Sequence, residues 1–130
     1  MTPNTFFAPE IFIDNRVNDI SFYQRAFGAK ELRRFSNDDG SIHVAELEID
    51  GAMFHIHEVT AKNHFFSPEK NNGTTVCIGL FVPDVDRVMK NAVNAGAKEM
   101  SAAQDFDYGY RQGVIKDPFG HIWQIQKRIS

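Results

Sequence analysis

Two histidines flank a single isoleucine in the stretch AMFHIHEV, which covers residues 52–59. Neutral imidazole nitrogens bind divalent metal ions, so His55 and His57 are the residues best suited to metal chemistry in this chain. Side chains two positions apart on a strand point to the same face. The pair therefore predicts either the start of a metal site or two polar residues on the wet face of a sheet.

Alternation along the apolar stretches indicates which side chains share that face. In residues 52–57, Phe54 and Ile56 fall on the face opposite the histidines, where they would pack against a helix. The same reading of three further stretches gives a core set of Ile11, Ile13, Val76, Ile78, Leu80, Val82, Trp123 and Ile125. The opposite, cavity-facing set is Ala8, Glu10, Phe12, Thr75, Cys77, Gly79, Phe81, Ile122, Gln124 and Gln126. A sheet exposed to bulk water would show the same pattern.

Other reactive side chains have plainer alternatives. Cys77 as a nucleophile would need a neighbouring base, and a lone cysteine in an apolar strand is more often a small hydrophobic residue. Arg111 could hold a carboxylate or phosphate through two hydrogen bonds, or it could pair with Asp105 or Asp107. His121 follows a turn glycine, which favours a structural role. His43 and His64 are expected on the surface or in strands, and residues 37–40 (NDDG) as a turn.

Composition narrows the class of protein. The chain has 130 residues and a net charge of −3, without a basic patch, so it offers no electrostatic basis for binding nucleic acid. No apolar run approaches the roughly 20 residues that span a bilayer, so no membrane partner is expected. A single cysteine, Cys77, excludes an internal disulfide. This cysteine use and the lack of a signal-like N-terminus predict a cytoplasmic protein.

The tetrapeptide Gly-Ala-Lys-Glu occurs twice, at residues 28–31 and 96–99. Each copy follows a helical pattern, predicted over 16–27 and after the N-cap Asp84, and each helix follows an apolar strand. Strands are then expected around 31–36, 41–49 and 52–59, and around 98–101, 110–116 and 121–128. We therefore predict an α+β fold made of two tandem βαβββ modules.

We predict that these modules form a single domain over residues 1–130. We name residues 6–60 module one, residues 61–73 the connector, and residues 74–128 module two. The connector is polar and too long for a tight turn, yet it contains Phe65 and Phe66. Two phenylalanines in water would be costly, so we expect them to pin an ordered segment.

Three motifs carry a family resemblance: residues 20–31 (ISFYQRAFGAKE), 82–99 (VPDVDRVMKNAVNAGAKE) and 108–125 (YGYRQGVIKDPFGHIWQI). With the two βαβββ modules they resemble the vicinal oxygen chelate superfamily of glyoxalases, bleomycin resistance proteins and extradiol dioxygenases, and within it the PhnB-like branch. The resemblance covers about residues 6–128. It implies cupped mixed sheets with helices outside, a small-molecule cavity and a homodimer. It also implies a cavity mouth at Tyr108, Tyr110 and Arg111.

The resemblance implies metal seats at Ala8, His55, Cys77 and Gln124. Alanine cannot bind a metal and Gln124 offers only an amide oxygen, so the inherited site looks lost. A shifted set of Glu10, His55 and His57 would need favourable rotamers. A divalent metal, with His55 as the candidate ligand, is thus disfavoured.

Three functions stay open. The first is a bleomycin-resistance-like protein that binds a small molecule without an intact inherited metal site. The alternative is a metal-dependent isomerase, lyase or dioxygenase built around His55 and His57. The third is a structural or interaction dimer with a vestigial cavity. The expected cavity residues are Glu10, Phe12, His55, His57, Cys77, Phe81, Tyr108, Arg111 and Gln124. The sequence leaves open the ligand, the catalytic residues, and whether the cavity lies within one chain or across a dimer.

Overall fold

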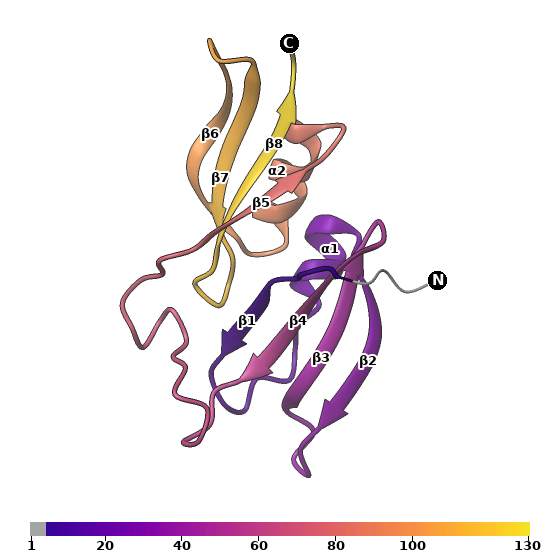
Figure 1. The fold of residues 1–130 in the computed structure, drawn as a ribbon, viewed down its shortest axis with the longest axis vertical. Helices are drawn as coiled ribbons and strands as arrows, with labels where there is room; N and C mark the ends of the chain where they lie inside the picture. Colours follow the sequence, from indigo (N-terminus) through magenta and orange to yellow (C-terminus); the bar gives the residue numbers. More distant parts are fainter. Residues whose placement is uncertain (1–4) are drawn as a thin grey trace.

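A computed structural model describes residues 5–130, which form two βαβββ modules joined by the connector (Figure 1). Module one contains β1 (Glu10–Ile13), α1 (Phe22–Phe27), β2 (Lys30–Ser36), β3 (Ile42–Ile49) and β4 (Ala52–Glu58). Module two contains β5 (Cys77–Phe81), α2 (Val85–Asn94), β6 (Lys98–Phe106), β7 (Tyr110–Lys116) and β8 (Ile122–Arg128). The predicted tandem α+β architecture is confirmed.

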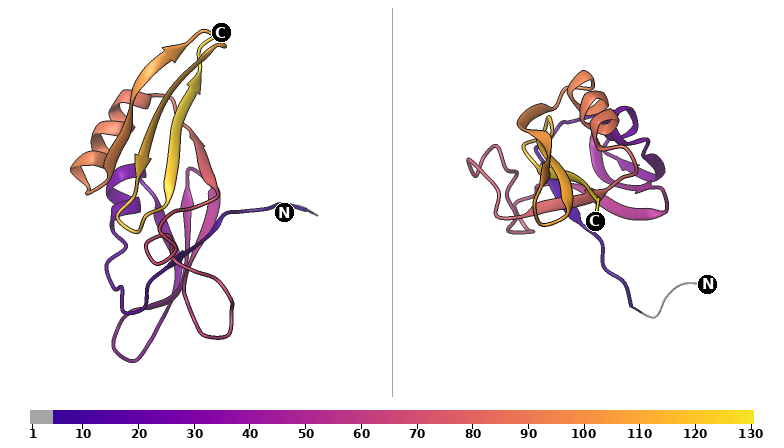
Figure 2. Two further views of the ribbon diagram at one scale, coloured as in Figure 1. Left: turned by 90° about the vertical axis from the view of Figure 1, so that its left-hand side faces the viewer. Right: turned by 90° about the horizontal axis from the view of Figure 1, so that it is seen from above.

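Each module folds into one four-stranded mixed sheet with the same topology. The strand orders are β1-β4-β3-β2 and β5-β8-β7-β6. In both sheets the first strand pairs in parallel with the last strand, and the other pairings are antiparallel. Figure 2 shows both helices on the same side of the molecule, where α1 packs against α2. The other face of each sheet is left free of helices.

The core lies between the helices and the sheets, as alternation predicts. Ile11, Ile13, Phe54 and Ile56 are buried in module one. Trp123 and Ile125 are buried in module two, together with Met89 from α2 and Ile115 from β7. Val76 departs from the prediction. It precedes the first residue of β5 and is 63% exposed, so it is not part of the core.

The first helix is shorter than predicted. It begins at Phe22 rather than near residue 16, although Ile20 is buried as its spacing indicated. Asp19 explains the late start, because its carboxylate accepts hydrogen bonds from the backbone N–H and hydroxyl of Ser21. Such local side-chain bonds compete with helix formation. They also lower the pKa of Asp19 below its ordinary value. The helix ends at Gly28, whose φ of 70° suits glycine.

Two further elements differ in length or packing from the prediction. Strand β6 runs to Phe106 rather than ending near residue 101. In the connector, Phe66 is 70% exposed and does not pin the segment. Phe65 is 57% exposed although it stacks on Phe12. The buried anchor is instead Ser67, whose hydroxyl donates to Asp14 Oδ1 at 2.5 Å.

Two polar contacts join module two to module one. Tyr23 on α1 donates to the buried carboxylate of Asp117 at 2.6 Å, and the imidazole of His121 contacts the carbonyl of Phe12 at 2.8 Å. Asp117 also accepts from Trp123 Nε1 and from the backbone N–H groups of Phe119 and His121. Burial, then the adjacent Asp117 carboxylate, raises the pKa of Tyr23 well above its ordinary value. The structural role expected of His121 is confirmed.

Candidate metal and ligand site

Strands β1 and β4 place Glu10, His55 and His57 together on the helix-free face of module one. In the parallel ladder Glu10 pairs with His55, and Phe12 pairs with His57. One ligand atom from each of Glu10, His55 and His57 lies within 4.8 Å of the others. We call these three residues the triad. The three side chains are therefore close enough for one ion to contact all of them.

The triad contains an orphaned buried atom. His57 Nε2 lies 3.0 Å from Glu10 Oε1, yet it is buried and makes no hydrogen bond. Buried polar atoms without a partner are rare and carry a cost in free energy. A nitrogen lone pair and a carboxylate oxygen that face the same small volume are what a cation needs. The donor set thus fits a divalent ion bound through two imidazoles and one carboxylate.

A second carboxylate lies on the other side of His55. Nδ1 of His55 is 3.7 Å from Glu10 Oε1, and its Nε2 is 3.9 Å from Glu46 Oε2. Carboxylates beside a metal-binding imidazole commonly fix its orientation and tautomer. Glu46 was missing from the predicted cavity set. The alternation of buried Ala45 and Leu47 with Glu46 along β3 is the signal that could have found it.

The register changes the seats that the family resemblance implied. His55 pairs with Glu10, which places a carboxylate where Ala8 was expected. In module two, Gln124 pairs with Gly79 and not with Cys77, which pairs with Ile122. Module one therefore offers better ligands than predicted, and module two offers poorer ones.

The predicted cavity residues form two groups, one in each sheet. Glu10, Phe12, His55 and His57 are together in module one. In module two, Phe81 and Tyr110 lie edge to face with their ring centroids 6.3 Å apart, and Tyr110 contacts Tyr108. The hydroxyl of Tyr108 donates to Gln112, whose amide donates to Gln126 at 2.8 Å. The Gln112–Gln126 pair was not predicted as part of a site.

Arg111 is engaged by carboxylates, as its plainer alternative stated. It donates to Asp86 at 2.8 Å and to Asp105 at 2.9 Å, whereas Asp107 was the other expected partner. These hydrogen bonds raise the pKa of the guanidinium above its ordinary value. Cys77 is exposed. Because Arg111 is paired with Asp86 and Asp105, its guanidinium is not free to bind an anionic ligand.

Glu58 is an unpredicted polar hub at the end of β4. It accepts hydrogen bonds from Asn15 and Asn37 and contacts His43 Nδ1 at 2.9 Å. Burial alone would raise the pKa of Glu58, but these three contacts outweigh it, and the pKa lies below its ordinary value. His43 is itself exposed and belongs to this hub rather than to the triad.

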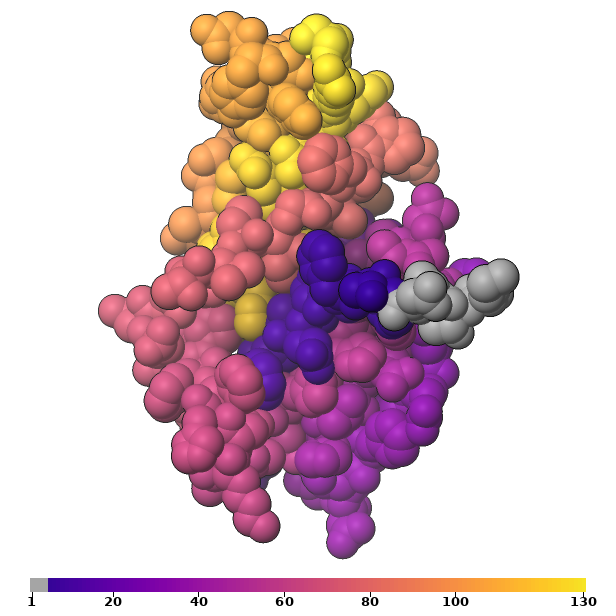
Figure 3. Space-filling model, viewed as in Figure 1, coloured from indigo at the N-terminus to yellow at the C-terminus, as the bar shows by residue number. Residues whose placement is uncertain are grey.

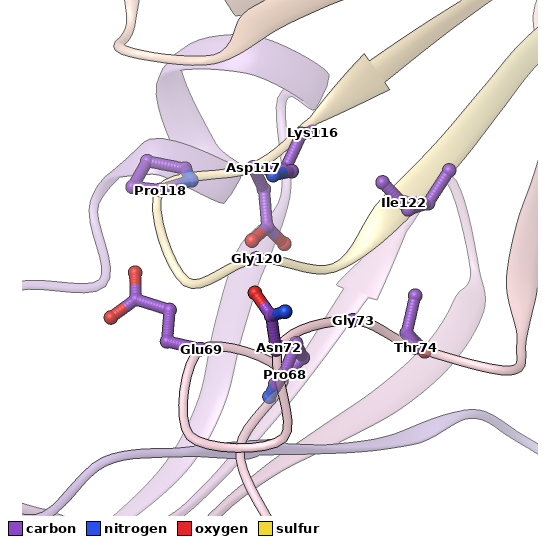
Figure 4. A pocket seen from close by; sticks show the side chains of 10 residues that line it. All are labelled: Pro68, Glu69, Asn72, Gly73, Thr74, Lys116, Asp117, Pro118, Gly120 and Ile122. Carbon is purple, nitrogen blue, oxygen red and sulfur yellow. The ribbon is translucent and has the colours of Figure 1, made fainter.

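Two hollows flank the junction between the connector and the modules. One, of about 480 Å³, lies between residues 68–74 and the turn at Asp117–Gly120 (Figure 4). Asp117 in its wall is already saturated by hydrogen bonds, so this hollow has little chemistry to offer. The other, of about 490 Å³, lies between β1 and the connector and includes Glu10 and Phe12 in its lining. Only the second adjoins the triad.

Comparison with known proteins identifies the family. The family model of the glyoxalase/bleomycin resistance protein/dioxygenase superfamily matches residues 16–125. The chain belongs to this superfamily. A protein of Mycobacterium bovis is 36% identical over 125 residues, which cover 94% of this chain and 82% of that protein.

Solved structures of the superfamily share its fold with this chain. The crystal structure of an Arabidopsis thaliana gene product has a TM-score of 0.72 at 26% identity and covers 93% of this chain and 97% of that one. The fosfomycin resistance protein FosX of Listeria monocytogenes has a TM-score of 0.68 at 15% identity and covers 97% and 94%. The vicinal oxygen chelate resemblance is thus confirmed, while the PhnB-like branch stays a prediction. Within residues 5–130, no helix has the length and apolar character to cross a membrane.

Proposed function

We propose that this protein binds a small molecule on the helix-free face of module one, through a divalent cation held by Glu10, His55 and His57. The observation that carries the proposal is the buried Nε2 of His57, which faces Glu10 Oε1 at 3.0 Å without a hydrogen bond. A cation between these atoms would satisfy both. It would also balance the negative charge of Glu10.

The residues of the triad have distinct tasks in this proposal. His55 and His57 act as neutral ligands, Glu10 supplies the anionic ligand, and Glu46 holds the outward nitrogen of His55. Three protein ligands leave coordination positions free for a ligand with paired oxygens. A bound divalent ion supplies Lewis acidity at those oxygens. This arrangement supports the isomerase, lyase or dioxygenase class over a purely structural site.

Metal-free binding of the bleomycin-resistance type is the second candidate. It is favoured by the weak donors of module two, where Gln124 and Gly79 occupy the positions that match His55 and Glu10. In that case the triad and Glu46 would act as hydrogen-bonding groups for a polar ligand. Both candidate functions involve the small-molecule ligand that was predicted from the sequence.

A homodimer is part of the same proposal. The exposed side chains of the strands include large apolar ones, among them Phe81 at 62% and Leu32 at 47%. Such exposure is typical of surfaces that are covered by a partner. The free Cys77 is consistent with the proposed cytoplasmic location.

The test is metal binding to protein purified without a histidine tag. We expect one zinc ion per chain by calorimetric titration, with cobalt, nickel and ferrous iron compared in the same way. His57→Ala and Glu10→Gln should each weaken zinc binding by about 100-fold, because each removes a ligand. His43→Ala, which removes an exposed histidine of the Glu58 hub, is the matched control and should bind as the native protein does.

Two results would count against the cation. Zinc binding that is equal in His57→Ala and His43→Ala would place the ion elsewhere. Failure of all four ions to bind would leave metal-free binding as the better function.

A further inference from the structure

The hollow between β1 and the connector has an aromatic wall directly beside the triad. Phe65 of the connector stacks on Phe12 with ring centroids 4.4 Å apart and an interplanar angle of 12°. Phe12 in turn stacks on His57, with centroids 5.4 Å apart and an angle of 28°. Phe65, Phe12 and His57 are therefore linked by successive ring contacts. Phe65 is the connector's member of this series and is 57% exposed, so it retains ring surface that is available to a ligand.

The hollow is large enough for a small organic group, and apolar side chains of the connector and of module two contribute to its lining. Its volume is about 490 Å³, and Phe65, Phe66, Val76 and Ile78 contribute to its lining. Phe65 and Phe66 are 57% and 70% exposed, which is a costly arrangement for adjacent phenylalanines in water. In Figure 3 the connector, in pink, lies beside the indigo residues of β1 on the face turned to the viewer. Exposed aromatic rings at the rim of a hollow are typical of ligand sites.

The connector holds Phe65 in place from both sides. Before it, the backbone N–H of Val59 donates to Ile13 at 3.0 Å. After it, buried Ser67 donates to Asp14 at the end of β1. His64, directly before Phe65, has a φ of 62°, a left-handed conformation that the surroundings must impose on a non-glycine residue. The chain on both sides of Phe65 is thus tied to Ile13 and Asp14, at the end of β1 and directly after it.

From these observations we infer that the hollow is a slot for a flat aromatic ring, with Phe65 as its stacking wall. The ligand class is an aromatic ring joined by a short chain to an anionic oxygen group. The ring packs on Phe65, and the anionic end reaches the triad past Glu10, which lines both sites. The part of this inference that concerns the anionic end rests on the proposed cation.

The test compares two probes that differ only in the ring. 3-Phenylpropionate and propionate are titrated into zinc-loaded and metal-free protein, and binding is followed by amide chemical-shift changes. Ring stacking is worth about a 2- to 10-fold gain in affinity, so 3-phenylpropionate should bind about that much more tightly. Phe65→Ala should abolish this ring preference. Phe35→Ala, which removes an exposed phenylalanine on β2 outside the hollow, should keep it.

The outcomes separate the slot from the cation. Equal affinity for the two probes, or an unchanged ring preference in Phe65→Ala, overturns the slot whether or not zinc binds. A ring preference that depends on Phe65 in metal-free protein supports the slot even if zinc fails to bind, in which case the cation proposal alone falls. Since Phe65 and Phe35 are both exposed, neither variant is expected to unfold the chain.

Discussion

The two modules have the same topology but opposite chemistry on their helix-free faces. His55 and Gln124 each lie four residues after a turn glycine, Gly51 and Gly120. Their partners on the first strand of each sheet are Glu10 and Gly79. One ladder position therefore carries a histidine–carboxylate pair in module one and an amide beside a glycine in module two.

The core positions of the two ladders did not diverge in this way. Ile11 pairs with Ile56 in module one, and Leu80 pairs with Ile125 at the matching position of module two. Packing against a helix requires apolar side chains at both places, whereas the opposite face is free to vary. The comparison teaches that a shared backbone keeps its core pattern while the site residues change.

In module two, a buried amide occupies the position that corresponds to Glu10 of the triad. A Cβ atom on Gly79 would lie 2.8 Å from Gln126 Nε2, so the amide of Gln126 occupies the volume where Glu10 projects in module one. Gln126 is buried and accepts from Gln112. Module one thus presents one unsatisfied ligand atom, His57 Nε2, and module two presents a hydrogen-bonded amide pair.

The largest expected effect concerns the contact that joins the unlike modules. Asp117→Ala should lower the free energy of unfolding by about 3–5 kcal/mol, because it leaves the buried Tyr23 hydroxyl and Trp123 indole N–H without their acceptor. Urea denaturation measures the change. Asp38→Ala, in an exposed turn of module one, is the control and should change stability by less than about 0.5 kcal/mol. Similar losses in both variants would show that the buried carboxylate is not the joint between the modules.

Transplanting the triad tests whether the backbones are equivalent. The triple variant Gly79→Glu, Gln124→His and Gln126→His places the residues of module one at the matching positions of module two. If the native protein binds one zinc ion, the variant should bind two, the second about 10- to 100-fold more weakly because its surroundings are not adapted. Calorimetric titration measures the number of zinc ions bound per chain. A folded triple variant that still binds one ion would break the equivalence of the two ladders.

Gly79→Ala tests whether the Gln126 amide fills the space beside residue 79. The added methyl group must displace the buried Gln126 amide, and we expect a loss of about 1 kcal/mol in unfolding free energy. In a Gln126→Ala background the same substitution should cost almost nothing. A double-mutant cycle measures this coupling. A cost that persists without Gln126 would point to the backbone of β5 instead.

The smallest expected effect is the pH dependence of stability that comes from Glu58. The matching position of β8 in module two is the exposed Lys127. Because the folded-state pKa of Glu58 is lowered, its contribution is present above the ordinary pKa of about 4.3 and is lost as pH falls through the folded value. Glu58→Gln should remove up to about 1 kcal/mol of this acid sensitivity. Urea unfolding curves recorded at about pH 5, 4 and 3 measure it. Parallel curves for the two proteins would contradict the role of the hub.

Much of the fold could be predicted because periodicity and turn residues are local signals. The duplicated Gly-Ala-Lys-Glu stretch and the alternation around Phe54 and Ile56 place the strands and the core correctly. The short α1 was missed because Asp19 caps its own turn, a competition that apolar spacing does not reveal. The exposure of Phe66 was missed because hydrophobicity predicts burial on average and does not reveal the conformation of a loop.

The site could be predicted only in its members and not in its register. Alternation correctly put Glu10, His55 and His57 on one face. Which residue of β1 lies opposite His55 depends on how two distant strands align, and a shift of two residues exchanges Ala8 for Glu10. That exchange turns an apparently lost metal seat into a set of converging ligand atoms.

The contact between Tyr23 and Asp117 also bears on the order in which the chain can fold during synthesis. The two residues are 94 positions apart, so the hydroxyl on α1 emerges from the ribosome long before its acceptor. Until the last hairpin follows, module one must keep that hydroxyl hydrated, which holds its core open to water. The nascent first half is therefore expected to stay loose and to close only when the carboxylate arrives.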